Sequence, residues 1–86
     1  MEDQNRKDLK KYLEALISPF LGSPDSFECN FSVDAMGTLY VIKIAKNDFG
    51  RVIGRGGETI KAIKYLLRAA GLSNGIRASI RVPENN

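Results

Sequence analysis

Hydrophobic side chains recur along the first part of the chain with the spacing of an amphipathic helix. Apolar residues fall three or four positions apart at Leu9, Leu13 and Leu16, and lysine and glutamate side chains fill positions between them. This period predicts a helix over residues 5 to about 18. Because a proline disfavours helical backbone at the residue before it, Pro19 places the end of the helix near residue 18.

Two segments then show the pattern of β-strands. Residues 27–34 alternate cleanly between apolar and polar side chains, which predicts a half-buried strand, and residues 38–45 predict a second strand with Tyr40, Ile42 and Ile44 on one face. Residues 35–37 make a short connection, so the two strands should pair as an antiparallel hairpin. Leu39 and Val41 fall on the outer face of the second strand.

The second half of the chain predicts two helices around a cluster of glycines. Asn47 and Asp48 are of the residue types that cap helices, and residues 49–53 suffice for one or two turns. Residues 58–70 show the most extended helical period, and Gly71 is a suitable C-terminal stop.

A third alternating segment, residues 76–82, is closed by Pro83 and predicts the last strand. The order of elements is therefore α-β-β-α-α-β, in a chain of 86 residues that suits one domain. We expect an α+β fold in which the helices pack on one face of a three-stranded sheet, leaving the other face polar and open to solvent. The single domain spans residues 1–86, with its core over about residues 6–83.

The composition argues against several classes of function. Histidine, the commonest general base and metal ligand, is absent, and the one cysteine, Cys29, falls on an apolar strand face where a core position is expected. Without metal-ligand spacing or paired carboxylates, we expect no enzyme activity, cofactor, metal or small-molecule substrate. The polar N-terminus and the absence of a long apolar run predict a cytoplasmic protein with no membrane span.

Charge is distributed unevenly along the chain. Residues 1–45 carry a net charge of −2 and residues 46–81 carry +6, within a total of +3. The basic part contains the glycine cluster, which favours a polyanion as partner. One basic face on an otherwise ordinary small protein is the alternative interpretation.

The glycine cluster is the most informative segment. Gly54, Gly56 and Gly57 surround Arg55 between two predicted helices. Glycines accept positive φ and allow another backbone to approach, and the following helix start favours an anion. An ordinary glycine-rich turn is the alternative. Glu58 follows where a P-loop has lysine, and no strand leads into the cluster as in a dinucleotide-binding unit, so ATP or NAD binding is not expected.

The segment VIGRGGETI, residues 52–60, resembles the Val-Ile-Gly-x-x-Gly-x-x-Ile signature of the KH domain. The order of elements matches the type II form of that fold. With the tracts DFGR at residues 48–51 and KAI at residues 61–63, the chain is similar to the small bacterial single-domain KH proteins of the KhpA type. The resemblance covers nearly the whole chain.

In KH domains, the Gly-x-x-Gly loop clamps the sugar–phosphate backbone of about four single-stranded nucleotides. The resemblance implies this clamp, and the apolar groove beside it, for Gly54, Arg55, Gly56, Gly57, Val52, Ile53 and Ile60, with Ile42 or Ile44 nearby. For the isoleucines at positions 42, 44 and 60, packing in the core is the preferred main role.

Basic residues near the loop allow two interpretations, phosphate contact or a solvated surface. We place Arg51, which precedes the loop, and Lys61 and Lys64, on the helix that follows it, with the RNA-binding residues. For Arg68, farther along that helix, a solvated face is preferred. The two arginines of the last strand are expected away from the groove.

The resemblance implies that this protein binds single-stranded RNA and catalyses no reaction. With no tryptophan, and with Tyr40 and Phe49 expected in the core, base preference should be low and affinity weak and salt-dependent. The resemblance also implies homodimers, or heterodimers with a larger Jag-type KH protein, and an RNA chaperone linked to cell-wall homeostasis and cell length. The alternative is a protein-interaction module whose RNA groove is secondary, motivated by Leu39 and Val41.

Overall fold

The computed structural model describes residues 2–83, and its elements follow the predicted order. The helices are α1 (Glu2–Ile17), α2 (Lys46–Ile53) and α3 (Glu58–Ser73), and the strands are β1 (Phe27–Asp34), β2 (Gly37–Ile44) and β3 (Ala78–Arg81). Short 3-10 turns occupy Ser18–Phe20, Pro24–Ser26 and Arg55–Gly57. Residues 1 and 84–86 of the predicted domain lie outside the described residues.

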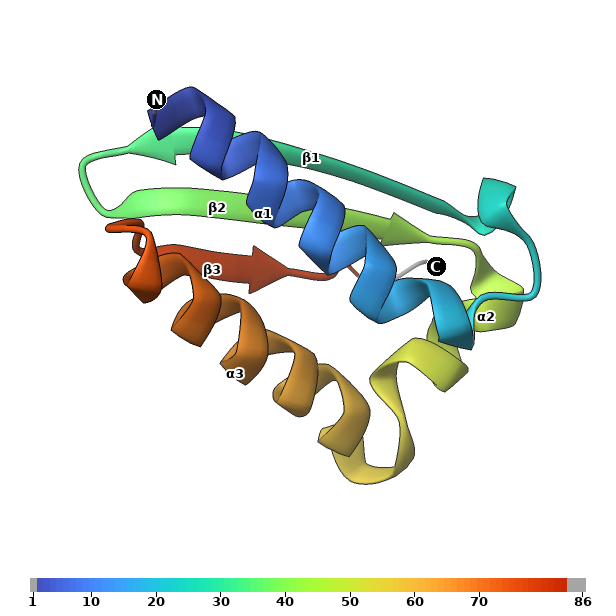
Figure 1. Ribbon diagram of the computed structural model, residues 1–86. Coiled ribbons are helices and arrows are strands. Elements are labelled where there is room, and N and C mark those ends of the chain that lie inside the picture. The colour runs from blue at the N-terminus through green and yellow to red at the C-terminus, as the bar shows by residue number, and fades with distance from the viewer. Residues whose placement is uncertain (1, 84–86) are drawn as a thin grey trace.

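The helices form one layer and the strands form the other (Figure 1). α1 and α3 lie side by side across one face of the sheet, and α2 lies near the end of the sheet at which β2 finishes (Figure 1). The opposite sheet face carries no described helix. The predicted α+β fold, with its helices on one face of a three-stranded sheet, is confirmed.

The sheet is mixed, with the strand order β1-β2-β3. β1 and β2 form the predicted antiparallel hairpin, in a register that pairs Phe27 with Ile44 and Asp34 with Gly37. β3 runs parallel to β2, because α2 and α3 carry the chain back before β3 begins. This topology leaves the outer edge of β3 without a neighbouring strand among the described residues, on the side where α3 lies.

The core fills the space between the two layers. Tyr40, on β2, is fully buried and donates a hydrogen bond from its hydroxyl to the backbone oxygen of Arg6 at 2.8 Å. Cys29 is buried as predicted, and this burial raises the pKa of its thiol to about 11, which keeps the thiol uncharged at neutral pH. The remaining buried apolar residues are Leu9, Leu13, Ile17, Ile42, Ile44, Val52, Ile60, Ile63, Leu67, Ile76 and Ala78.

The helices differ from the predictions mainly at their ends. α1 begins at Glu2 rather than at residue 5, and α3 continues to Ser73 through Gly71. The prediction that Gly71 stops the helix is therefore wrong. A Cβ atom at this position would lie 2.8 Å from the backbone oxygen of Ile76, so glycine is needed where the chain folds back against the helix. Within residues 2–83, no helix combines the length and the apolar character that crossing a membrane requires.

Candidate nucleic-acid interface

α2 is held in place by a buried carboxylate. The prediction that residues 47 and 48 cap this helix is wrong, because α2 begins at Lys46 and Asp48 lies inside it with only 4% of its surface exposed. Asp48 accepts a hydrogen bond from the backbone N–H of Gly22 at 2.9 Å. A side-chain hydrogen bond with Ser26, then the Gly22 bond, and then the charge of Arg51 lower the pKa of this carboxyl. The network ties α2, and so the loop after it, to the segment before β1.

α2 ends because Gly54 leaves the helical conformation, with φ 78° and ψ 173°. The N–H of Gly54 still donates to the backbone oxygen of Gly50 at 2.9 Å. A Cβ atom on Gly54 would overlap the hydroxyl of Thr59 and lie 2.7 Å from the Thr59 Cβ. Both the positive φ and the close approach of α3 therefore require glycine at this position.

The rest of the loop is open to solvent. Gly56 adopts φ 63° and ψ 16°, and Gly57 adopts φ 76° and ψ 15°, both in the left-handed region. A Cβ atom on Gly56 would meet nothing within 4 Å, and the Arg55 side chain beside it is exposed. The loop therefore presents bare backbone with a flanking cation, to which another polymer backbone can come close.

The loop leads directly into α3. Gly57 is the N-cap of this helix, and no described side chain makes a capping hydrogen bond there. The first N–H groups of a helix lack partners within the helix, and together with the helix dipole they favour an anion. Glu58 in the first turn partly offsets this potential, whereas Arg55 and Lys61 add to it. The N–H of Glu58 already donates to the backbone oxygen of Arg55, so the start of α3 attracts a phosphate group through its dipole and the cations beside it.

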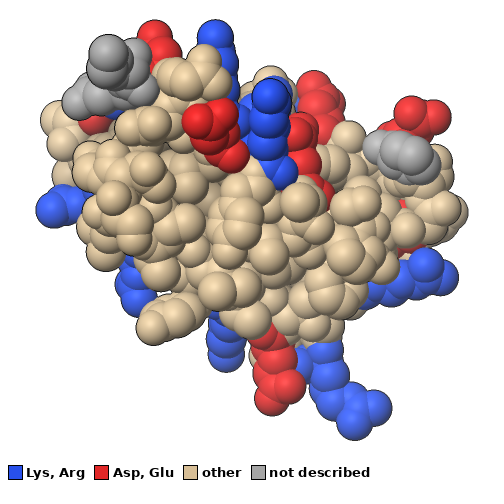
Figure 2. All heavy atoms as spheres, viewed as in Figure 1, with Lys and Arg blue, Asp and Glu red and all other residues tan. Residues whose placement is uncertain are grey.

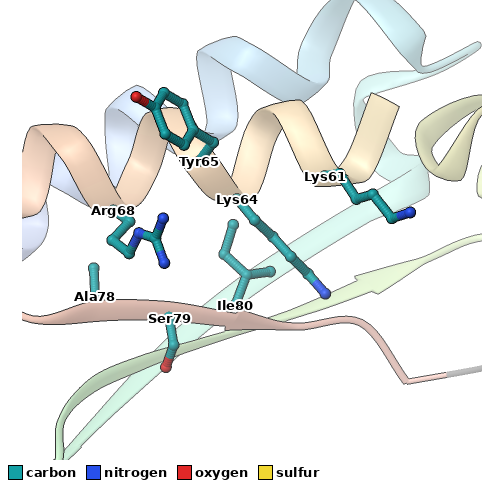
Figure 3. A pocket seen from close by; sticks show the side chains of 7 residues that line it. All are labelled: Lys61, Lys64, Tyr65, Arg68, Ala78, Ser79 and Ile80. Atoms are coloured by element: carbon teal, nitrogen blue, oxygen red, sulfur yellow. The ribbon is translucent and has the colours of Figure 1, made fainter. Parts of the chain in front are cut away.

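Beyond the loop, a groove of about 420 Å³ runs between α3 and β3. Figure 3 shows Lys64 and Arg68 pointing from α3 toward β3, with Ile80 pointing back toward α3 between them, whereas Tyr65 points away from β3. The apolar floor and the cationic rim suit a negatively charged chain that also carries flat apolar groups. The residues that line the groove are Lys61, Lys64, Tyr65, Arg68, Ala78, Ser79 and Ile80.

The charge pattern separates this edge from the rest of the helical face. Figure 2 shows Lys and Arg side chains projecting along the lower edge of the view, where α3 lies in Figure 1, with an acidic side chain among them. The middle of the same face carries no charged side chains in this view. A second groove of about 400 Å³ lies there between α1 and α3, lined in part by Leu16, Phe20 and Leu66.

The structure divides the apolar residues assigned to the interface. Val52 is fully buried and Ile60 is 7% exposed, so their side chains support the loop from the core and form no open groove surface. Ile53 is half-buried. The preferred core role is confirmed for Ile60, and also for Ile42 and Ile44 on β2.

The basic residues are also divided. Lys61 and Lys64 both line the groove, next to the loop. Arg51 instead faces the segment before β1, and its Nη1 atom lies 3.8 Å from Asp48 Oδ1 with the side chain 67% exposed. Arg68, for which a solvated face was preferred, lines the groove as well.

Four groove residues, Tyr65, Ala78, Ser79 and Ile80, escaped the sequence prediction. Ser79 and Ile80 line the groove because β3 packs beside α3. The periodicity of β3 alone does not predict which helix lies next to it. Tyr65 lies four residues after Lys61 and three before Arg68, a helical spacing that could have placed it beside them. As predicted, Tyr40 is in the core; Phe49 is half-buried against it.

Comparison with known proteins gives one consistent result. The chain is 30% identical over 76 residues to the "RNA-binding protein KhpA" of Chlamydia pneumoniae, covering 88% of this chain and 97% of that protein. It is 26% identical over 74 residues to the protein of the same name from Clostridium acetobutylicum, covering 86% and 99%. No solved structure gives a significant match. The profile of the family "KhpA/KhpB, KH domain" matches residues 10–82, so the chain belongs to this family of KH-domain proteins.

Proposed function

We propose that this protein binds single-stranded RNA without catalysing a reaction on it. The observation that carries the proposal is the continuity of two features. The open glycine loop lies at the start of α3, and Lys61, one turn into the same helix, lines the cationic groove between α3 and β3. The naming of the Chlamydia and Clostridium relatives as RNA-binding proteins supports the proposal.

The loop grips the backbone of the RNA. Gly56 offers no side chain that would hold a sugar–phosphate chain away, and its surroundings are empty within 4 Å of a Cβ position. A phosphate placed there meets the positive end of the α3 dipole and the guanidinium of Arg55. These contacts act on any sequence, so they set position and affinity rather than base preference.

The groove receives the nucleotides that follow. Lys61 and Lys64 neutralise phosphates along the rim, and Ile80 offers an apolar surface to the bases. The outer edge of β3, which has no neighbouring strand among the described residues, offers backbone N–H and C=O groups to base edges. One short groove of this kind reads few bases, which gives weak binding that salt reduces.

A matched pair of substitutions at Gly56 tests this proposal. Asn and Asp both tolerate the left-handed backbone found there, and both have room, so both variants should fold. They differ by one negative charge, placed where the phosphate should lie. In fluorescence anisotropy with a labelled octanucleotide, Gly56→Asp should lose at least about tenfold more affinity than Gly56→Asn, in line with a charge-assisted contact. Equal affinity in the two folded variants would contradict the proposal.

The resemblance to KhpA-type proteins extends the proposal to the cell. We propose a cytoplasmic RNA chaperone that acts after transcription, with a role in cell-wall homeostasis and cell length. Deletion of the gene should change cell length or shape, and the wild-type gene should restore both. Restoration by the Gly56→Asp variant as well would separate the cellular role from RNA binding.

A second candidate function, self-association, has its own structural support. Leu39 and Val41, on the outer face of β2, are half-buried, but Leu66 on α3 is 42% exposed and lines the largely apolar groove between α1 and α3. Ala62 lies one turn before Leu66 and lines the same groove. Packing of this surface against a second copy would bury it and give two RNA sites in one particle.

Sedimentation tests this second function. The protein alone should sediment as a dimer, and Leu66→Glu should convert it to a monomer with an unchanged fold. The resemblance also implies a larger Jag-type KH protein as a partner for this surface. Mixing that protein with this one would show whether the Jag-type protein displaces the second copy from the homodimer. A monomeric wild-type protein at high concentration would rule out the homodimer.

A further inference from the structure

We propose that Tyr65, with Arg68 beside it, is a stacking site for a nucleobase of the bound RNA. The inference rests on the proposed function and deepens it. It assigns to the groove a base contact in addition to the contacts that the loop makes with the sugar–phosphate backbone. A nucleobase is the chemical group that this site would take.

The exposure of Tyr65 is the observation that requires explanation. Its side chain is 63% exposed on α3, whereas Tyr40 is fully buried and Tyr12 is 38% exposed. The Cζ atom of Arg68 lies 5.9 Å from the centroid of the Tyr65 ring. The two side chains come from neighbouring turns of α3 and both line the groove; Figure 3 shows the Arg68 guanidinium on the β3 side of the helix and the Tyr65 ring turned away from β3.

This pair has the chemistry that binds bases. Unstacked bases of single-stranded RNA stack on aromatic rings and on guanidinium planes. The guanidinium is also weakly hydrated for a cation, so covering it with a base removes little favourable hydration. Its positive charge attracts the phosphates on either side of that base. A neutral exposed aromatic residue would lack this second attraction.

The site lies on the path that the loop defines. Tyr65 is about 10 Å along the helix from Glu58, given the rise of 1.5 Å per residue. Lys61 lies one turn before Tyr65 and lines the same groove, so it can hold a phosphate between the loop and the stacked base. An RNA strand must therefore continue past the loop to gain from Tyr65.

A protein partner is the competing explanation for an exposed tyrosine. Charge favours the nucleic acid, because Tyr65 shares its groove with Lys61, Lys64 and Arg68. Leu66, the next residue, instead lines the largely apolar groove between α1 and α3, which has no lysine or arginine in its lining. The base-stacking site and the self-association surface thus lie on adjacent but different sides of α3.

The test compares an octanucleotide of adenosines with an abasic octamer that has the same sugar–phosphate backbone. Tyr65→Leu should weaken binding of the octanucleotide by at least about fivefold, the lower range for one base–aromatic stack, and leave the abasic octamer unaffected. Tyr65→Phe should retain the affinity, because it retains the ring. Tyr12→Leu, on α1, is the matched control and should change neither affinity.

Fluorescence gives a second readout that does not depend on affinity. The chain has no tryptophan, so Tyr65→Trp introduces a single indole whose emission stacking should quench when the octanucleotide binds, whereas Tyr12→Trp should show no quenching. Full affinity of Tyr65→Leu, or a change in its oligomeric state without RNA, would overturn the stacking site. If wild-type protein and Gly56→Asp bind RNA equally, the proposed function itself fails, and this inference fails with it.

Discussion

The carboxylate of Asp48 accepts a hydrogen bond from the backbone N–H of Gly22 at 2.9 Å, across 26 residues of sequence. Because Asp48 lies in α2, one turn before Val52, this bond fixes the helix that leads into the glycine loop. A residue far from the groove in sequence therefore helps to set the position of the candidate RNA site.

The Asp48 network predicts a dependence of stability on pH. Hydrogen bonding with Ser26 and Gly22 lowers the pKa of Asp48 in the folded protein below its ordinary value of 3.8. The ionised Asp48 carboxylate therefore makes its full contribution to the free energy of unfolding at pH values above 3.8. This contribution is lost as the pH falls through the lower pKa that Asp48 has in the folded protein. Urea denaturation from about pH 6 to about pH 2.5 should show this loss. Asp48→Asn should be less stable at neutral pH and show a weaker decline in acid; an equally steep decline would contradict the assignment.

Two glycines inside helices should respond to alanine in opposite directions. Gly50, in α2, has nothing within 4 Å of a Cβ position, so Gly50→Ala should stabilise the fold by up to about 1 kcal/mol through helix propensity. Gly71, in α3, would place its Cβ 2.8 Å from the Ile76 oxygen, so Gly71→Ala should destabilise it by about 1–3 kcal/mol. Thermal or urea unfolding measures both changes. Stabilisation by Gly71→Ala would show that β3 does not pack as described.

The loop glycines should also differ from each other. Both Gly54 and Gly56 have positive φ, so alanine at either position is strained by about 1 kcal/mol. Only Gly54 lies against the side chain of Thr59, so Gly54→Ala should lose more stability than Gly56→Ala. The difference between the two unfolding free energies isolates the contact with Thr59. Equal losses of stability in the two variants would mean that Thr59 and the start of α3 can move away from a Cβ atom on residue 54 with no loss of stability.

The lysines of the groove should set the salt dependence of RNA binding. Replacing Lys61 and Lys64 together by glutamine removes two phosphate contacts, so the slope of log K against log salt should become shallower by about 1.4 for a single strand. Lys7 and Lys11, exposed on one face of α1 and four residues apart, give the control pair, whose slope should stay unchanged. If both pairs of substitutions changed the salt slope equally, RNA would be attracted by the net charge of the protein and not by the lysines of the groove.

The sequence was sufficient for the order of elements and for the loop, because both depend on local patterns. Alternation fixed the strands, and Gly54 and Gly56 mark backbone that other residues adopt only with strain. Gly71 was misjudged because a glycine near a helix end is usually a stop, and only the return of the chain at Ile76 shows otherwise. Asp48 was misjudged for a related reason: its partner, Gly22, is distant in sequence.

The groove was harder to predict than the loop. Its rim comes from α3, but its floor comes from Ile80 on β3, and no local pattern states that β3 lies beside α3 rather than at the other edge of the sheet. For the same reason, Arg68 was assigned to a solvated face and Tyr65 was given no role. Val52 was assigned to the groove surface, although its full burial makes it a support of the loop.

The most direct test of the central claim is to map the RNA on the protein by NMR. On titration with an octanucleotide, the account predicts that the largest shifts of backbone amide signals fall at Gly56, Gly57 and Lys61, with further shifts along β3. The amides of Glu28 and Asn30 on β1, far from the groove, should change little. Largest shifts on β1, with the loop unaffected, would contradict the claim that the glycine loop and the groove beside it are the RNA site.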